Sequence, residues 1–157
     1  IQILWEWCYQ MTEINIRYLQ DNDGDRYYPV THVDAIAGTS VDDWTKFNLD
    51  KPATQNTAFK DETPQGFDCS YKTLELFDLK VKSIRINASN VKDGQLLTTL
   101  SDDFDLPLTP QSFYVRTPST RQAGIVTLRP DGTLYFYNKD SNWTTTDYIY
   151  SQYTWIE

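Results

Sequence analysis

Residues 124–137 place the strongest local constraint on what this chain can fold into. The run Gly-Ile-Val-Thr-Leu-Arg is followed by a short turn sequence and then by Thr-Leu-Tyr-Phe-Tyr-Asn. In the turn, Pro130 presets the φ angle of the first position, Asp131 tolerates the second, and Gly132 supplies the left-handed residue that a short hairpin loop needs. The sequence therefore predicts an antiparallel hairpin here.

The second run of this hairpin divides into two sets, because side chains alternate between the faces of a strand. Leu134 and Phe136 share one face, and we expect them in the core. Tyr135 and Tyr137 share the other face, and we expect them to form a contact surface. The aromatic run 148–156 is expected to pair beside the hairpin and close its sheet.

Composition extends the β prediction to the rest of the chain. Aromatic residues make up 15% of the 157 residues, including 11 Tyr and 5 Trp, and such residues favour strands. About seven short runs, with a turn every ten residues or so, follow residue 70, and this spacing is typical of a sandwich or barrel. We predict an all-β protein whose head, residues 68–157, is an antiparallel, jelly-roll-like β-sandwich.

One run in the head breaks the alternation expected of a single strand. Leu79 and Val81 are in one phase, and Ile84 and Ile86 are in the other, with Lys82 and Ser83 between them. Such a slip is read either as two strands or as one strand with a bulge.

The segment before the head reads as a separate unit. Residues 13–19 and 26–31 alternate around an acidic turn and predict a small β-hairpin, which a short helix over 31–38 follows. Residues 41–49 have near-helical apolar spacing and predict a short amphipathic segment. We therefore assign 11–49 to an N-terminal unit.

Two further segments complete the predicted domain organisation. Residues 50–67 are polar and rich in turn residues, which is typical of a linker. Residues 1–10 differ in character from the rest of the chain, and Met11 is the single methionine. Two interpretations stay open for these ten residues: sequence upstream of the natural start, or a genuine apolar leading strand.

Charge and cysteine usage exclude several classes of function. The net charge of −8 argues against nucleic-acid binding, which relies on an excess of Lys and Arg. No apolar run approaches the roughly 20 residues of a membrane span, so membrane insertion is not expected. Cys8 and Cys69 have neither a metal-ligand spacing nor a disulfide framework, and no cofactor is predicted.

Two acidic clusters are weighed as chemical sites. Asp21, Asp23 and Asp25 alternate as in a calcium loop, but Arg26 and His32 stand where that motif needs Gly and a bidentate Glu. We therefore predict a plain acidic turn and no metal site.

The second acidic cluster lies at residues 102–105. Asp102, Asp103 and Asp105 could in principle supply the paired carboxylates that cleave a glycosidic bond. No other feature supports such a site, and acidic loops usually only face water. We favour a solvated loop and predict no catalytic residues and no enzymatic activity, with a glycan hydrolase as the remaining alternative.

The aromatic residues near the C-terminus are the stronger functional candidates. Large, rigid, amphipathic rings give contact area at low entropic cost and can stack on sugars or anchor a protein interface. For any single ring, a place in the core or between subunits is the competing interpretation. The predicted ligand-binding residues are Tyr135, Tyr137, Trp143 and Tyr148, with Tyr150 and Tyr153 in the same aromatic set.

Residues 28–36, Tyr-Pro-Val-Thr-His-Val-Asp-Ala-Ile, follow an Ile-Asn-Ile-Arg strand and an acidic turn. This arrangement resembles the N-terminal segment of structural proteins from tailed bacteriophages of Gram-positive hosts, a group of head-fibre, baseplate, tail-fibre and receptor-binding proteins. The hairpin 124–136 and the closing Tyr-Thr-Trp-Ile look like the β-sandwich heads of such fibres.

The resemblance implies a short homotrimeric fibre on the virion surface. Its N-terminal segment would attach to other virion proteins, and its head would bind a host cell-surface polysaccharide. A purely structural capsid or baseplate decoration protein is the alternative that stays open. The attachment residues implied by the resemblance are Tyr28, Pro29, Val30, Thr31, His32 and Asp34.

Overall fold

The computed structural model describes residues 19–20, 26–27, 39–57 and 66–157, and the chain divides into two units, 1–35 and 36–157. In the first unit, β1 (Leu19–Gln20) pairs antiparallel with β2 (Arg26–Tyr27). This pairing confirms the predicted N-terminal hairpin. Its acidic turn, the predicted helix, the leader 1–10 and the attachment residues 28–34 lie outside the described residues.

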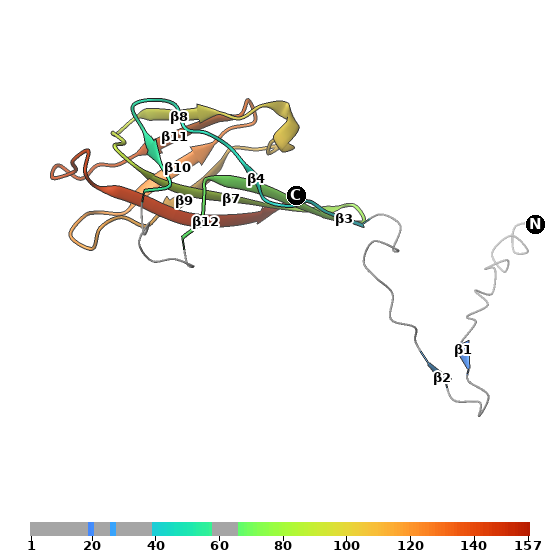
Figure 1. Ribbon diagram of the computed structural model, residues 1–157. Coiled ribbons are helices and arrows are strands. Elements are labelled where there is room, and N and C mark those ends of the chain that lie inside the picture. The colour runs from blue at the N-terminus through green and yellow to red at the C-terminus, as the bar shows by residue number, and fades with distance from the viewer. Residues whose placement is uncertain (1–18, 21–25, 28–38, 58–65) are drawn as a thin grey trace, which may run out of the picture. The chain divides into compact units, whose positions relative to one another are not determined.

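The second unit is a sandwich of two antiparallel sheets (Figure 1). The four-stranded sheet has the order β8-β11-β10-β9. Strands β9, β10 and β11 are connected as successive hairpins, and β8, which precedes them in the chain, lies beside β11, as in a Greek key. Its strands are β8 (Gln95–Thr99), β9 (Gln111–Val115), β10 (Gly124–Leu128) and β11 (Thr133–Tyr137). The predicted all-β sandwich is therefore confirmed.

The six-stranded sheet has the order β12-β7-β6-β3, and two short strands join it at β6 and β7. Its strands are β3 (Thr39–Val41), β4 (Thr45–Lys46), β5 (Thr54–Gln55), β6 (Ser70–Leu76), β7 (Leu79–Ser89) and β12 (Tyr148–Ile156). The described residues contain a single short helix, the 3-10 turn η3 (Asp102–Phe104).

The core lies between the two sheets and follows the alternation of their strands. Leu134 and Phe136 of β11 are fully buried, whereas Tyr135 and Tyr137 are half-buried on the outer face. The predicted division of this strand is confirmed. Other strands supply the remaining buried apolar side chains, which include Ile84, Ile86, Leu97, Val126, Leu128 and Ile149.

The predicted hairpin turn is also confirmed in its details. The Arg129 N–H donates to the Thr133 carbonyl at 3.0 Å, and the Gly132 N–H donates to the Arg129 carbonyl at 2.9 Å. Gly132 has a φ of 81°, the left-handed conformation that glycine adopts at no steric cost. Asp131 accepts hydrogen bonds from the backbone N–H and the hydroxyl of Thr133.

The prediction that residues 148–156 close the sheet of this hairpin is wrong. Strand β12 pairs with β7 in the other sheet, from Tyr148 opposite Ser89 to Ile156 opposite Val81. The hairpin is instead flanked by β8 and β9. In the described residues, an isolated bridge between Arg116 and Tyr150 joins β9 to β12.

The predicted break at Lys82 is wrong as well. Strand β7 runs without a register shift against both β6 and β12. Lys82 points into the core, where its side chain is 2% exposed, and Ile84 and Ile86 continue the same inward phase. The sequence pattern looked like a change of phase because a lysine occupies an inward position. Leu79 and Val81 lie on the outer face of the same strand.

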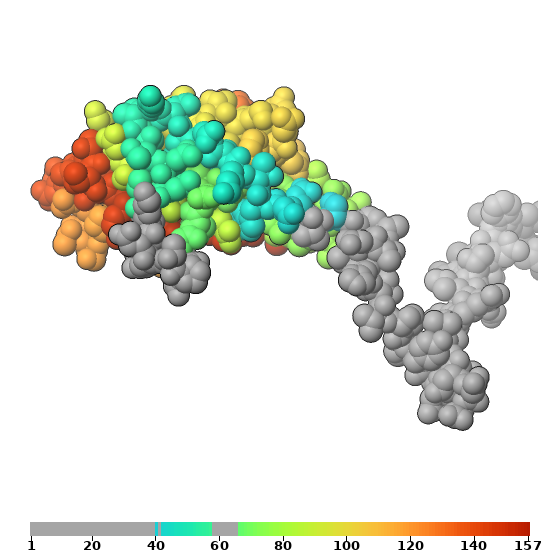
Figure 2. Space-filling view, in the orientation of Figure 1, coloured from blue at the N-terminus to red at the C-terminus, as the bar shows by residue number. Residues whose placement is uncertain are grey.

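The amphipathic segment at 41–49 and the linker at 50–67 are corrected by the structure. Residues 39–57 pair along the six-stranded sheet, with Thr45 opposite Tyr71 and Thr54 opposite Ser89. Figure 2 shows this cyan to green segment lying against the sandwich. Strands pair through backbone N–H and C=O groups, which do not depend on the polarity of the side chain. A polar segment can therefore pair as a strand even when its composition is typical of a linker. Residues 58–65 lie outside the described residues.

Candidate functional site

Outward-facing side chains of β9, β10 and β11 form a surface that we call the tyrosine face. Its residues are Tyr114, Ile125, Tyr135 and Tyr137. Ile125 is opposite Tyr114 on one side and Tyr137 on the other, so these three form a row across the sheet. In the adjacent row, Thr127 of β10 is opposite Tyr135 of β11 on one side and Ser112 of β9 on the other.

The rings of the tyrosine face remain open to solvent to different degrees. Tyr114 is 74% exposed, and Tyr135 and Tyr137 are half-buried. The Tyr135 and Tyr137 rings are 6.1 Å apart between centroids, at an interplanar angle of 23°. The Arg129 guanidinium lies 4.7 Å from the Tyr135 centroid and adds a cation–π contact.

This geometry suits the binding of a flat, partly apolar ligand. Aromatic faces pack against the C–H face of a sugar ring or against a flat protein surface, and phenolic hydroxyls add hydrogen bonds. Hydroxyls lie beside the rings as well, since Ser112 Oγ and Thr127 Oγ1 are 2.9 Å apart on the same face.

The structure separates the predicted ligand-binding residues. Tyr135 and Tyr137 lie together, but Tyr148 is on β12, on the outer face of the other sheet. Trp143 is half-buried. Its Nε1 donates to the Val91 carbonyl at 2.8 Å, and its ring is 5.4 Å from that of Phe136. Of the four predicted ligand-binding residues, the structure therefore brings only Tyr135 and Tyr137 together on one face.

The two other members of the aromatic set are also apart from the tyrosine face. Tyr153 stacks on Phe113 in the space between the sheets, at 4.5 Å and 5°. Tyr150 stacks on Phe67 at 4.4 Å, outside the six-stranded sheet. The physical reason is the pairing of β12 with β7, which carries the aromatic residues of β12 away from the hairpin.

Tyr114 and Ile125 belong to the tyrosine face and were missed by the sequence analysis. A signal for Tyr114 existed, since residues 112–115 alternate Ser, Phe, Tyr and Val, with Phe113 and Val115 buried. Their grouping with Tyr137 depends on the register of β9 and β10, which the sequence does not state.

A second aromatic group lies outside the six-stranded sheet. The Arg85 guanidinium is 3.7 Å from the Trp44 centroid and 5.1 Å from that of Phe67. Its Nε donates to Gln152 Oε1 at 2.9 Å. The rings of Trp44 and Phe67 contact the guanidinium, and the hydrogen bond to Gln152 uses its edge. Arg85 is therefore well suited to holding these two rings against the sheet.

The aspartates at 102–105 form the turn η3 and the residue after it. Asp103 and Asp105, together with Asp42 and Asp43, line a surface depression of about 310 Å³. Both carboxylate oxygens of Asp105 are 3.3 Å from Lys80 Nζ. The contacts of Asp105 therefore fix the loop to β7.

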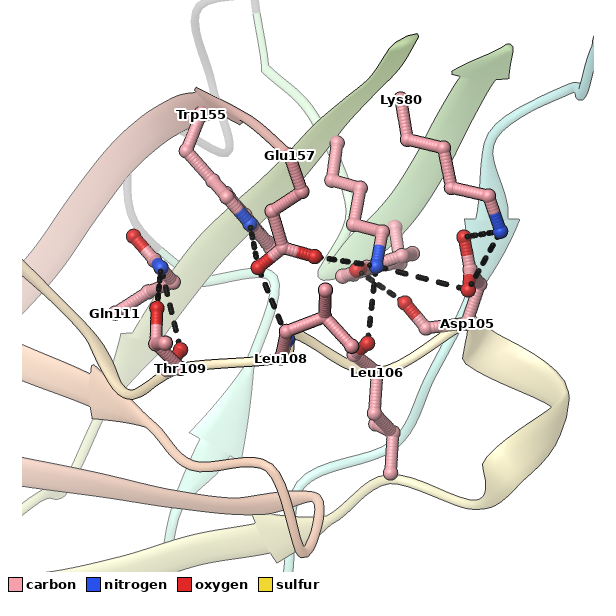
Figure 3. Close-up of polar contacts among 10 residues, drawn as sticks. Lys80, Asp105, Leu106, Leu108, Thr109, Gln111, Trp155 and Glu157 are labelled. Atoms are coloured by element: carbon pink, nitrogen blue, oxygen red, sulfur yellow. Dashed lines mark hydrogen bonds and ion pairs between the residues drawn. The ribbon is translucent and has the colours of Figure 1, made fainter. Parts of the chain in front are cut away.

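The buried ammonium of Lys82 connects this loop to the end of β12. Figure 3 shows its partners Asp105, Leu106 and Glu157 close together. Lys82 Nζ donates to the Leu106 carbonyl at 2.9 Å and to Glu157 Oε2 at 2.8 Å, and it is 3.6 Å from Asp105 Oδ1. The other oxygen of Glu157 accepts from the Leu108 N–H and from Trp155 Nε1. The charges are thus paired and hydrogen-bonded, as burial requires.

The pKa of the Glu157 carboxyl reflects these contacts. Burial by itself would raise this pKa, because it penalises the charged form. The hydrogen bonds from Lys82, Leu108 and Trp155, together with the Lys82 charge, outweigh burial and hold the pKa below its ordinary value. Burial also raises the pKa of the Tyr71 hydroxyl, which donates to the Asp105 carbonyl.

Comparisons with known proteins add no assignment, since no protein-family model and no curated protein matches the chain. Among the described residues, no group of three or more His, Cys, Asp or Glu side chains is placed to hold a metal ion. The same residues include no helix that is long and apolar enough to cross a membrane. The tyrosine face therefore stands as the candidate site on its geometry alone.

Proposed function

We propose that this protein is a fibre or baseplate protein of a bacteriophage virion and that its head binds a host cell-surface carbohydrate through the tyrosine face. The observation that carries the binding assignment is the row of Tyr114, Ile125 and Tyr137 on an outer sheet face, with Tyr114 74% exposed. The virion assignment is supported by the resemblance of residues 28–36 and 124–136 to phage structural proteins. No reaction and no cofactor are assigned.

The chemistry of the face favours a carbohydrate. Three phenol rings offer apolar planes edged by hydroxyl groups, and the neighbouring Ser112 and Thr127 offer two more hydroxyls. Pyranose rings have the same combination of an apolar C–H face and polar rims. A shallow face of this kind binds weakly, so repeated copies of the head would raise its avidity.

Repeated copies are part of the proposal, because a second surface of the head is suited to subunit contact. We call it the apolar patch, and it lies where β6, β7 and β12 meet at one end of the six-stranded sheet. Phe77 is 59% exposed and Ile156 63% exposed. The residues of the apolar patch are Leu74, Leu76, Phe77, Leu79, Val81 and Ile156.

Contiguous exposed apolar side chains of this kind mark protein–protein contacts. A homotrimer that covers the apolar patch would leave the tyrosine face, on the opposite sheet, available for ligand. In this proposal the N-terminal segment contacts other virion proteins and places the protein on the particle surface.

Binding to an array of purified bacterial polysaccharides and to Gram-positive cells tests the carbohydrate assignment. We expect Tyr135→Ala combined with Tyr137→Ala to lower retention by about tenfold or more. Tyr148→Ala is the matched control, since this tyrosine points outward from the other sheet. Thermal unfolding checks that each variant is folded. Unchanged retention of the folded double variant would rule out the tyrosine face as the binding site.

A purely structural decoration protein is the second candidate. The observation that favours it is the stacked pair of Tyr135 and Tyr137 rings, because such rings also suit a contact between subunits. In that case the head contacts only neighbouring virion proteins. Light scattering at micromolar concentration separates the two candidates. If the head is an adhesin with subunits joined at the apolar patch, Leu79→Asp yields monomers and the tyrosine variants stay trimeric. If the tyrosine face joins subunits, its variants dissociate and no polysaccharide is retained.

A further inference from the structure

A shallow groove of about 490 Å³ lies beside the tyrosine face, where the ends of β9 and β12 meet. Its walls come from β9, from the loop between β9 and β10, and from β12. The residues that matter here are Tyr114, Arg116, Thr117, Ser119, Arg121 and Ser151. Because Tyr114 belongs to both surfaces, the groove and the tyrosine face are continuous.

The charge of the segment that forms the groove is opposite to that of the whole chain. Residues 106–130 contain three arginines and no aspartate or glutamate, in a protein with a net charge of −8. No carboxylate lines the groove itself. The arginines of this segment would therefore attract an anionic ligand, whereas the acidic groups over much of the remaining surface would repel it.

Arg116 has a fixed backbone and an exposed side chain. Its N–H donates to the Tyr150 carbonyl at 3.1 Å, and its carbonyl accepts from the Tyr150 N–H at 3.0 Å. Among the described residues, no carboxylate forms an ion pair with Arg116. Within the part of the chain that the structure describes, its guanidinium is therefore not neutralised by a carboxylate, and its backbone is fixed two residues from Tyr114.

The second arginine of the groove is held in place by a carboxylate outside the lining. Arg121 Nε is 2.8 Å from Asp147 Oδ2, and the side chain of Asp147 is itself held by the Thr144 N–H and hydroxyl. Nε is one of five N–H donors on a guanidinium. This bond therefore fixes the orientation of Arg121 and, as far as the described residues go, leaves its other donors for a ligand.

The loop that carries these residues is ordered by its own hydrogen bonds. The Arg121 N–H donates to the Pro118 carbonyl at 2.9 Å, and Thr117 Oγ1 donates to the Gln122 carbonyl at 3.1 Å. Across the groove, Ser151 Oγ donates to the Tyr114 carbonyl at 3.3 Å. A preorganised loop lowers the entropic cost of binding.

We propose that this groove binds an anionic group, a phosphodiester or a uronate carboxylate, on the polysaccharide held by the tyrosine face. Arg116 makes the principal charged contact, since a guanidinium matches the two oxygens of either anion. Tyr114 lies at the junction of the two surfaces, where it would contact the sugar ring next to the anionic group. This inference rests on the proposed function and names the chemical class of its ligand.

Retention on matched pairs of immobilised polysaccharides tests the inference. One arm compares phosphomannan with neutral mannan, a second compares polygalacturonate with its methyl ester, and an array of purified bacterial polysaccharides covers other sugars. We expect anionic polymers to be retained more strongly than their neutral partners, and increasingly so at low salt. Arg116→Gln should weaken anionic retention about tenfold or more, to the neutral level.

Two further variants serve as controls. Arg116→Lys keeps the charge without the planar fork, and we expect it to retain part of the affinity for anionic polymers. Lys51→Gln removes one exposed charge near β8, at the other edge of the four-stranded sheet, and should change nothing.

The outcomes separate this inference from the proposed function. If neutral and anionic polymers are retained alike, or if Arg116→Gln binds anionic polymers as the wild-type chain does, the inference is overturned and the carbohydrate assignment stands. If the wild-type chain retains no polysaccharide of any kind, the carbohydrate assignment is overturned and the inference falls with it.

Discussion

Lys82 Nζ lies 2.8 Å from Glu157 Oε2, and the lysine side chain is 2% exposed. The two residues are 75 positions apart in the chain. Their ion pair joins β7 to the end of β12. Lys82 also donates to the Leu106 carbonyl, and this bond joins β7 to the segment between β8 and β9. A buried charge of this kind is costly to leave without its partner.

We expect Lys82→Met to lower the free energy of unfolding by about 3 kcal/mol, because it leaves the Glu157 carboxylate unpaired. Urea denaturation measures the change. Lys80→Met is the matched control: Lys80 lies two residues away, and its ion pair with Asp105 is more than a third exposed, so its loss should stay below about 1 kcal/mol. Equal losses for the two variants would contradict the structural role of Lys82.

The lowered pKa of Glu157 predicts a pH dependence of stability. A carboxyl whose pKa is lower in the folded state stabilises the fold above its unfolded pKa, roughly 4.3, and loses that contribution as the pH falls through the folded pKa. The wild-type chain should therefore lose stability more steeply below about pH 4.3 than Glu157→Gln. Urea denaturation from pH 7 to acidic pH measures both. A constant difference between them would count against this assignment.

Gly132, in the hairpin turn between β10 and β11, and Gly94, in the connection between β7 and β8, form a matched pair of turn glycines. Both have positive φ, 81° and 72°, so alanine costs about 1 kcal/mol or somewhat more at either position. At Gly132 the new Cβ would also overlap the carbonyl oxygen of Leu100, whereas at Gly94 it would meet open space. We expect Gly132→Ala to be at least about 2 kcal/mol more destabilising than Gly94→Ala. Similar denaturation midpoints would contradict the packing of the turn on Leu100.

Trp143→Ala should act on stability. Its ring packs against Phe136, and its Nε1 satisfies the Val91 carbonyl, so we expect a loss of about 3 kcal/mol in thermal or urea unfolding. Tyr137→Ala, which removes a half-buried ring from the outer face, should cost less than about 1.5 kcal/mol. A fully stable Trp143→Ala variant with lost binding would return Trp143 to the ligand-binding set.

The parts of the fold that the sequence predicted are those encoded over a few neighbouring residues. The turn at Pro130 to Gly132 and the alternation of Leu134 to Tyr137 each depend on local backbone preferences and on the two-residue period of a strand. Both are confirmed. The hairpin around the acidic turn near the N-terminus was predicted in the same way.

The errors concern long-range pairing. Residues 148–156 have a clear strand pattern, but nothing in that pattern names β7 as the partner. Residues 41–49 were predicted to be an amphipathic segment from their near-helical apolar spacing, and residues 50–67 a linker from their polar, turn-rich composition. Pairing at a sheet edge needs only backbone donors and acceptors, which neither pattern reveals. Lys82 interrupts the apolar alternation of β7 although its side chain is buried. The groups that make its burial possible belong to residues 106 and 157, which are distant in the sequence.

The sequence by itself determined that the chain is built of strands, where the closing hairpin turns, and that Tyr135 and Tyr137 share the face opposite Leu134 and Phe136. Only the tertiary structure decided which other side chains join them. Register placed Tyr114 and Ile125 beside Tyr137, and the pairing of β12 with β7 moved Tyr148 to the other sheet. The physical reason is that side-chain alternation is a property of one strand, whereas a surface is assembled from strands whose order depends on the packing of the whole core.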